Sequence, residues 1–311
     1  MPAASVPPPA FDLTDEVRSA LERGRAVVAL ESTIISHGLP RPDNLRVARE
    51  VEAVVRSHGA VPATIALAHG RVRIGLDDEA LAAIAANANV VKAGVRDIAP
   101  VLVGGGYGAT TVASTAHLAA LAGITVFATG GLGGVHREAA KTFDESADLI
   151  TLSRVGTTVV CAGVKSILDV PATLERLETL GIGLLGFGTD RFPGFYLADS
   201  GLRVEHRVET AVEVAEVMAA RAASGTQTSA LLVLNPVSAG EQLDPALHDR
   251  VLHAALDAAA AQGIRGKDTT PYLLARLHDA TQGRSLAVNT RIISANAALA
   301  AQIAVAAAAA R

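Results

Sequence analysis

The chain has 311 residues, of which half are hydrophobic and 19% are charged, so it can bury a sizeable core. Its net charge is -4 and its basic side chains are scattered, which argues against nucleic acid and against a membrane surface as partners. The single cysteine, Cys161, excludes an internal disulfide framework and fits a reducing compartment.

The amino-terminal residues and the apolar runs bear on localisation. Residues 1–10 contain four prolines and no basic side chain, unlike a signal peptide. No apolar run reaches the roughly 20 residues that span a bilayer, and the Ala-rich stretch 306–310 is better explained as helix. We therefore expect a soluble, cytoplasmic protein with a disordered arm over residues 1–11 and one domain over residues 12–311.

Segments with strand and helix patterns alternate along the chain. Strands are predicted over 25–30, 63–68, 71–75, 90–92, 124–129, 157–161, 182–188 and 230–234, with a hairpin at His69-Gly70. Helices are predicted over 15–23, 44–57, 77–86, 110–121, 171–180, 207–222, 244–262 and from 285 to the end. This alternation predicts a single α/β domain with a mostly parallel sheet. The aromatic segment 192–196 is interpreted as a lid or a subunit contact.

Polar or glycine-rich positions follow several of the predicted strands. Glu31, Lys92, the loop that begins at Gly130, Lys165 and Asn235 all come at or just beyond a strand end. In a parallel α/β sheet the carboxyl ends of the strands open into a crevice where ligands bind. We therefore expect one active site at this edge of the sheet.

Lys165 is the strongest candidate for catalysis. Only 4 of the 27 basic residues are lysines, so arginine is the usual cation of this chain. A guanidinium stays protonated and forms no imine, whereas a partly buried amine can attack a carbonyl. Val164 and Ile167 flank the lysine, and burial between them would disfavour its charged form. The alternative is a structural lysine whose stem passes a strand end to reach solvent.

Three further stretches are candidate binding elements. Gly104 to Gly108 leads toward a helix that begins near Thr110, which suits a phosphate or, alternatively, only a tight turn. Residues 130–137 lack the dinucleotide fingerprint, because His136 stands where its last glycine belongs. Residues 141–148 hold three carboxylates, which indicate either a Mg²⁺ or Mn²⁺ ligand or an acidic helix start capped by Asp144 or Ser146.

An amine nucleophile, a carboxylate and a phosphate-sized glycine loop together favour imine chemistry on a phosphorylated sugar. A kinase is disfavoured because the Gly-x-x-x-x-Gly-Lys-Ser/Thr loop is missing. Two alternatives stay open. One is a Schiff-base aldolase that acts on another sugar phosphate, and the other is a sugar-phosphate-binding protein without turnover.

The sequence also resembles the pseudouridine-5′-phosphate glycosidases over residues 12–305. This sequence departs from the pattern of that family at Ala93-Gly94-Val95 and at Ala295. The stretches that carry the resemblance are 29–38 (ALESTIISHG), 62–66 (PATIA), 108–113 (GATTVA), 128–137 (ATGGLGGVHR), 142–148 (TFDESAD) and 161–169 (CAGVKSILD).

This resemblance implies a three-layer α/β/α fold, a homotrimer and a Mn²⁺ cofactor. The implied reaction is the reversible cleavage of pseudouridine 5′-phosphate to uracil and ribose 5-phosphate, a step of pseudouridine catabolism. Lys165 is implied as the nucleophile at ribose C1′, Glu31 as the proton donor and Asp144 as the metal ligand. The residues implied to bind substrate are Lys92, Val112, Ser146, Ala147 and Asp148.

The residue types suit this reaction. A C-glycoside has no heteroatom leaving group, so the paired-carboxylate route of ordinary glycosidases does not apply directly. An imine between Lys165 and ribose C1′, with Glu31 moving the proton at uracil C5, is the expected route.

Overall fold

The structure, a computed structural model, describes residues 11–264 and 269–310. Of the arm predicted over residues 1–11, only Phe11 is among the described residues, and it begins the first strand.

The strands are β1 Phe11–Leu13, β2 Val27–Leu30, β3 Val61–Ala68, β4 Arg71–Ile74, β5 Val91–Ala93, β6 Gly108–Thr110, β7 Val126–Ala128, β8 Thr158–Cys161, β9 Gly183–Phe187, β10 Arg207–Val208 and β11 Leu231–Leu234. The helices are α1 Asp15–Glu22, α2 Asp43–Ser57, α3 Asp78–Ala86, α4 Ile98–Gly104, α5 Val112–Leu121, α6 Ala139–Thr142, α7 Ala147–Leu152, α8 Val170–Thr179, α9 Ala211–Ala223, α10 Pro245–Ala261, α11 Thr269–Ala280 and α12 Arg284–Ala309, with short turns η1 Ile34–Gly38 and η2 Val95–Asp97.

The strands form one mostly parallel sheet, as predicted. Its order is β1-β4-β3-β2-β7-β8-β11-β9-β10, and β6 also pairs with β3 and with β5. The pairs β3–β4 and β3–β6 are antiparallel, and β3–β4 is the hairpin expected at His69-Gly70. From β2 through β11 the central strands all run the same way, so their carboxyl ends share one edge.

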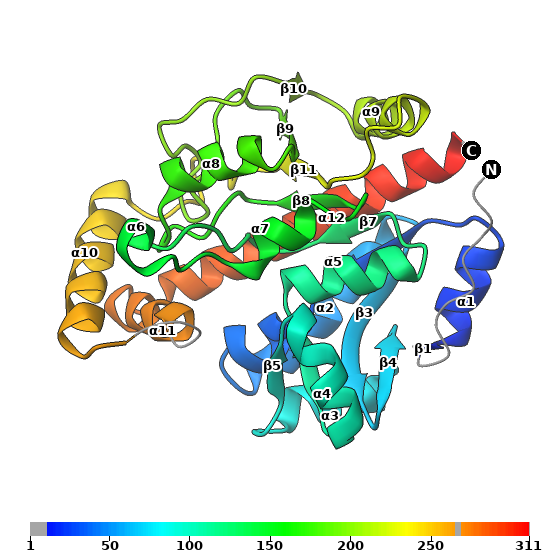
Figure 1. Cartoon of the computed structure of the whole chain (residues 1–311), viewed down its shortest axis with the longest axis horizontal. Coiled ribbons are helices and arrows are strands. Elements are labelled where there is room, and N and C mark those ends of the chain that lie inside the picture. Colours follow the sequence, from blue (N-terminus) through cyan, green and yellow to red (C-terminus); the bar gives the residue numbers. More distant parts are fainter. Residues whose placement is uncertain (1–10, 265–268, 311) are drawn as a thin grey trace.

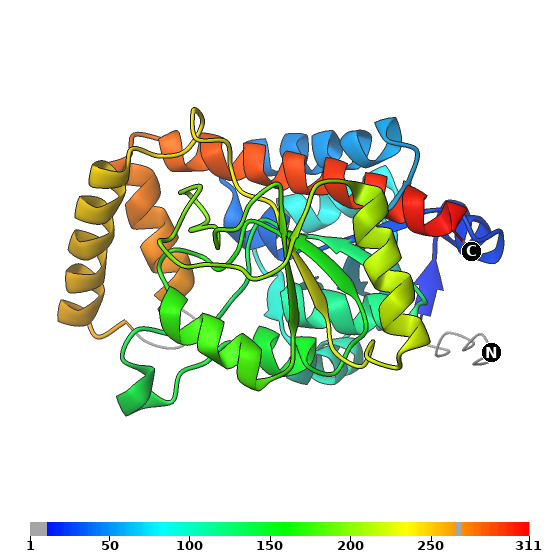
Figure 2. The same ribbon diagram turned by 90° about the horizontal axis from the view of Figure 1, so that it is seen from above.

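Helices cover both faces of the sheet, which gives the expected three layers. Figure 1 shows α5 and α7 in front of the central strands, with α12 crossing behind them. In Figure 2, α2 and α12 lie side by side along one face, while α8 lies on the opposite face. The pair α10 and α11 packs together at one end of the molecule in both views.

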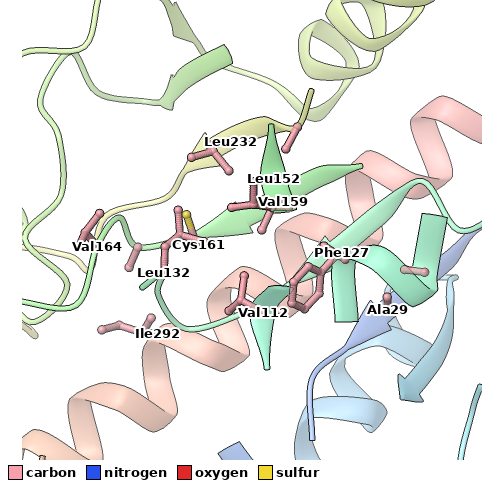
Figure 3. Close-up of a cluster of buried hydrophobic side chains, with 14 of the residues drawn as sticks. Ala29, Val112, Phe127, Leu132, Leu152, Val159, Cys161, Val164, Leu232 and Ile292 are labelled. Carbon is pink, nitrogen blue, oxygen red and sulfur yellow. The ribbon is translucent and has the colours of Figure 1, made fainter. Parts of the chain in front are cut away.

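Alternate residues of the central strands face opposite layers of the core. Val28 and Leu30 pack with α2 and α12, whereas Ala29 packs with α5 and α7 on the other side. Figure 3 shows the core layer that contains Ala29, where Phe127, Val159 and Leu232 from neighbouring strands meet. A sheet buried on both faces explains why these strands are continuous apolar runs instead of alternating ones.

Helix α12 differs from the sequence expectation in one respect. Its 26 residues, Arg284–Ala309, are long and apolar enough to cross a membrane by length and composition, although no such run was expected. Half of its most apolar window is buried within the molecule, against the central strands and the helices α2 and α9. A core helix that covers a sheet has this composition for that reason.

Other elements also differ from what the sequence predicted. Residues 207–210 are not helical: β10 forms there, and α9 begins only at Ala211, after its N-cap Thr210. The sequence analysis predicted no helix at α4, α6 or α11. The rings of Phe192, Phe195 and Tyr196 are at most 3% exposed and pack into the core, so they offer no surface for the subunit contact that was one of the two interpretations of this segment.

Candidate active site

The edge formed by the ends of β2, β7 and β8 brings together the residues that follow these strands. Leu30 pairs with Ala128, and Ala128 pairs with Val160. Glu31 therefore lies beside Thr129 in space, although 98 residues separate them in the chain. The predicted location of the site, at the carboxyl edge of a parallel sheet, agrees with this register.

Two threonine hydroxyls contact the Glu31 carboxylate. Thr33 Oγ1 lies 2.8 Å from Oε2, and the hydroxyl of Thr129 donates a short hydrogen bond to Oε1. Thr33 Oγ1 is also 2.5 Å from the carbonyl of Thr110, so its single proton is shared between two acceptors. The carboxylate is half-buried and held by its neighbours, as a group that moves a proton at a fixed place must be.

An asparagine pair supports Thr129 from the opposite layer. Asn296 on α12 donates from Nδ2 to the carbonyl of Thr129 at 2.7 Å, and Asn235, after β11, donates to Asn296 Oδ1 at 3.0 Å. Neither threonine nor this pairing was predicted. Thr129 could have been found, because it ends a predicted strand beside the glycine loop.

Lys165 contacts the same loop from the other side. Its backbone N–H donates to Leu132 O at 3.0 Å, and its Nζ donates to Gly131 O at 2.5 Å. Val164 is fully buried and Ile167 is 2% exposed, while Lys165 itself is half-buried. The amine is thus hydrogen-bonded to the backbone of the glycine loop, while part of the side chain stays accessible.

Gly131 and Gly133 of the loop 130–134 have no room for a side chain where they contact Phe195 and the start of α7. A Cβ on Gly131 would lie 2.5 Å from the ring of Phe195, and one on Gly133 would lie 2.7 Å from Asp148 Oδ2. These are closer than real Cβ contacts allow. The glycines are therefore needed for close packing, in addition to any approach of a ligand.

Asp148, one of the predicted substrate-binding residues, accepts hydrogen bonds from two separate backbone segments. It is 6% exposed, and its oxygens accept from Ala113 N at 2.9 Å and from Gly133 N at 2.8 Å. The carboxylate thus connects the first turn of α5, which begins at Val112, with the glycine loop. A negative charge at a helix N-terminus is favourable.

The other two members of the predicted triplet lie at the start of α7. Ser146 is its N-cap, as one of the sequence alternatives expected, and accepts from Asp148 N at 3.2 Å. Ala147 is the first helical residue and is exposed. Val112, Ser146, Ala147 and Asp148 are therefore brought together where α5 and α7 begin.

Lys92, His37 and His136 form a second group. Lys92 lies in β5, and its positive charge lowers the pKa of both histidines, in addition to the larger effect of their burial. Asp144 opposes this at His136, since its Oδ2 is 3.8 Å from Nδ1 and raises that pKa. The lysine, the two histidines and Asp144 thus lie within one electrostatic environment.

The residues around Asp144 offer few ligands to a metal ion. Within residues 11–264 and 269–310, no three His, Cys, Asp or Glu side chains come together to hold an ion by themselves. Asp144 offers one partly exposed carboxylate with His136 beside it. This donor set fits a hard divalent ion only if waters or a bound anion supply the other ligands, which is usual for Mg²⁺ and for similar ions.

The glycine stretch 104–108, for which a phosphate loop and a tight turn were the alternatives, does not lead directly into a helix. Gly104 ends α4, and β6 separates the glycines from α5. The hydroxyl of Thr110 donates to Ile65 O at 2.7 Å, and Thr111 caps α5 in a reciprocal pair with Ser114. Both hydroxyls therefore have hydrogen-bond partners within the chain itself.

Two features near Gly130 bear on ligand binding. A mostly apolar cavity of about 30 Å³ adjoins Glu31, Thr129 and Gly130 and extends toward α2. Asn289 on α12 is 9% exposed, and its Oδ1 has no hydrogen-bond partner in the described part of the chain. That oxygen would lie 3.3 Å from a Cβ placed on Gly130. A buried acceptor of this kind is suited to a ligand N–H or O–H.

Comparison with known proteins gives consistent matches over most of the chain. The family described as "Indigoidine synthase A like protein" matches residues 16–306. The pseudouridine-5′-phosphate glycosidase of Streptomyces griseus is 61% identical over 299 residues, which cover 96% of this chain and 93% of that protein. The Salinispora tropica protein of the same name is 60% identical over 294 residues, covering 94% and 91%.

A solved structure is similar as well. The crystal structure of a prealnumycin C-glycosynthase in complex with ribulose 5-phosphate aligns with a TM-score of 0.90 at 34% identity. The alignment covers 98% of this chain and 99% of that one.

Proposed function

The chain belongs to the pseudouridine-5′-phosphate glycosidase family, and on that basis we propose that it reversibly cleaves pseudouridine 5′-phosphate to uracil and ribose 5-phosphate. The observation that carries the proposal is that two reactive groups contact one loop. Glu31 accepts from Thr129, and Lys165 donates to Gly131, two residues further on. A nucleophile and a proton carrier are thereby held on either side of the same backbone segment.

The first step assigned to Lys165 is attack on C1′ of the ribose. Its amine, once it has lost a proton, forms the C1′–N bond while the C1′–O4′ bond breaks, and O4′ takes up a proton. Lysine suits this step because its amine can be deprotonated, whereas arginine stays charged. The carbonyl of Gly131 orients the amine through the hydrogen bond from Nζ.

Glu31 is assigned the proton at C5 of the uracil. Once C5 is protonated, the lone pair on nitrogen forms the C1′=N bond, the C1′–C5 bond breaks, and its electron pair returns to the uracil ring. Water then hydrolyses the imine to give ribose 5-phosphate and free Lys165. In the reverse direction the imine is attacked by uracil C5, and Glu31 removes the proton.

The predicted substrate-binding residues are assigned around this pair. Lys92, with His37 and His136 near it, supplies positive charge for the phosphate. Val112 and the Ser146 to Asp148 segment shape the wall made by α5 and α7. The unpaired Oδ1 of Asn289 suits an N–H of the uracil ring.

Mn²⁺ is proposed as the cofactor, with Asp144 as the residue that would hold it. A divalent ion there would neutralise negative charge on the bound phosphate. The support is the partly exposed carboxylate of Asp144 beside His136, which leaves most ligand positions to water or substrate.

A homotrimer and a cytoplasmic location are proposed as well. The location is supported by a phosphorylated substrate, which does not cross membranes unaided.

The test is direct. Purified protein is incubated with pseudouridine 5′-phosphate and Mn²⁺, and uracil and ribose 5-phosphate are measured by chromatography. Uridine 5′-phosphate is the control substrate, because its base leaves from nitrogen and needs no proton at C5. Release of uracil from the C-glycoside alone is expected. Comparable rates on both nucleotides would contradict the assigned chemistry, and no uracil from either would contradict the function.

A further inference from the structure

His248 contacts the turn that carries Lys165 from a distant part of the chain. It lies in the first turn of α10, whose N-cap Asp244 accepts from Leu247 N at 2.7 Å. The imidazole is 4% exposed, and its Nε2 lies 2.9 Å from Oγ of Ser166, which is 5% exposed. Ser166 directly follows Lys165. Helix α10 is therefore linked to the residue next to the proposed nucleophile.

Backbone hydrogen bonds hold the Lys165 turn at both of its ends. The N–H of Lys165 donates to Leu132 O at 3.0 Å, and the N–H of Leu168 donates back to Lys165 O at 3.0 Å. Between these ends, the Arg137 guanidinium approaches the carbonyls of Ser166 and Ile167 at 3.4 Å, which is long for a hydrogen bond. The contact between the side chains of Ser166 and His248 is shorter, at 2.9 Å.

The surroundings of His248 favour its neutral form. Burial lowers its pKa most, and the charges of Arg137 and His253 lower it further, while Asp249 raises it. Asp249 Oδ1 is 3.5 Å from Nδ1, which has no hydrogen-bond partner in the described residues. The ring of Tyr196 lies 6.3 Å away, centroid to centroid. With its proton on Nδ1, the neutral ring accepts the Ser166 hydroxyl proton at Nε2.

We propose that His248 is a positioning residue that acts through Ser166 to hold the Lys165 amine on the carbonyl of Gly131. This rests on the proposed role of Lys165 as the nucleophile. A displacement of about 1 Å in a reacting group can cost roughly 100-fold in rate. Because Ser166 and His248 are not assigned to the substrate, loss of their hydrogen bond should lower kcat and leave KM nearly unchanged.

Four variants test the link. His248→Phe removes the acceptor and keeps an aromatic ring, His248→Gln keeps a polar group at the Nε2 position, and Ser166→Ala removes the donor. Asp257→Asn, on the exposed side of the same helix, is the control. We expect kcat to fall roughly 10- to 100-fold in His248→Phe and in Ser166→Ala, with KM within about twofold. The double variant His248→Phe/Ser166→Ala should be no slower than either of its single variants. His248→Gln should lose less kcat than His248→Phe.

A second measurement does not depend on the glycosidase reaction. The protein is methylated with limiting formaldehyde and cyanoborohydride, and the rates at Lys165 and at the exposed Lys141 are compared by peptide mass spectrometry. Loss of the link should change the Lys165 to Lys141 ratio by about threefold or more in both His248→Phe and Ser166→Ala. If the parent protein releases no uracil, the proposed function fails, but this ratio still tests the positioning role.

Two results would overturn the proposal: unchanged kcat in Ser166→Ala together with an unchanged methylation ratio, or additive losses in the double variant. Should His248→Phe fail to fold, the Ser166→Ala variant decides alone. That variant removes a single oxygen and tests the same hydrogen bond.

Discussion

At the scale of single residues, the amine of Lys165 is bound to the carbonyl of Gly131 between fully or nearly fully buried neighbours. Reduction with borohydride in the presence of ribose 5-phosphate should leave a covalent sugar on Lys165, detectable by mass spectrometry. Lys165→Arg keeps the positive charge but forms no imine, so it should abolish both the adduct and turnover. An Arg variant with measurable turnover would refute the imine route.

Glu31 offers the complementary test, because two threonines hold its carboxylate in place. Glu31→Gln retains the shape of the side chain and removes its capacity to carry a proton. We expect turnover to fall by roughly 10²–10⁴-fold, with ribose 5-phosphate binding retained, as is usual when a positioned acid or base is lost. Binding is measured by calorimetry and turnover by uracil release. A variant within a few-fold of the parent would assign the proton to another group.

Asp144 should matter through the metal. EDTA is expected to remove activity, and Mn²⁺ to restore it, whereas Asp144→Asn should stay nearly inactive even at saturating Mn²⁺. Manganese binding itself is followed by electron paramagnetic resonance, which requires no turnover. Full activity in EDTA would exclude a required metal. Glu145, which pairs with Arg176 at 3.0 Å, provides a nearby carboxylate for the control Glu145→Gln.

At the scale of secondary-structure elements, the glycine loop and the starts of α5 and α7 depend on one another through Asp148. A Cβ on Gly133 would lie 2.7 Å from Asp148 Oδ2, so Gly133→Ala should push α7 away from the loop and break the bond to Gly133 N. We expect a loss of about 1–3 kcal/mol in stability, typical of overpacking, and weaker substrate binding. Urea unfolding measures the first effect and KM the second.

The control for this change is Gly106→Ala, because a Cβ on exposed Gly106 would meet no atom within 4 Å. It should leave both stability and KM nearly unchanged. Equal effects at the two positions would show that glycine is not needed for close packing at Gly133.

At the scale of the whole molecule, several large apolar side chains remain exposed, among them Val103 at 90% and Phe143 at 86%. Exposed apolar surface commonly marks an interaction site. We expect a homotrimer by light scattering at micromolar protein, and Phe143→Ser should weaken it if this residue lies in the contact. A monomer under these conditions would contradict the proposed assembly. Exposed Val212, on the far element α9, gives the control Val212→Ser.

Much of the fold could be predicted because apolar runs and helical spacing are local properties of the sequence. The strands at 27–30, 158–161 and 231–234 and the helices at 43–57 and 245–261 were expected within a few residues. What the sequence did not predict depends on contacts between distant segments. Strand β6 interrupts the glycine stretch, because Gly108 to Thr110 pairs with β3 and β5, and pairing partners are not visible in a short segment.

For the site, the residue types that follow the parallel strands can be identified from the sequence, which places Glu31 and Lys165 at one edge of the sheet. The partners of these two residues depend on the folded chain. The register of β2 with β7 places Thr129 beside Glu31, the loop at 130–134 brings Gly131 to the lysine, and α10 brings His248 to Ser166. These contacts join residues 34 to 98 positions apart. They depend on strand register and helix packing, which the whole chain sets and which no local pattern records.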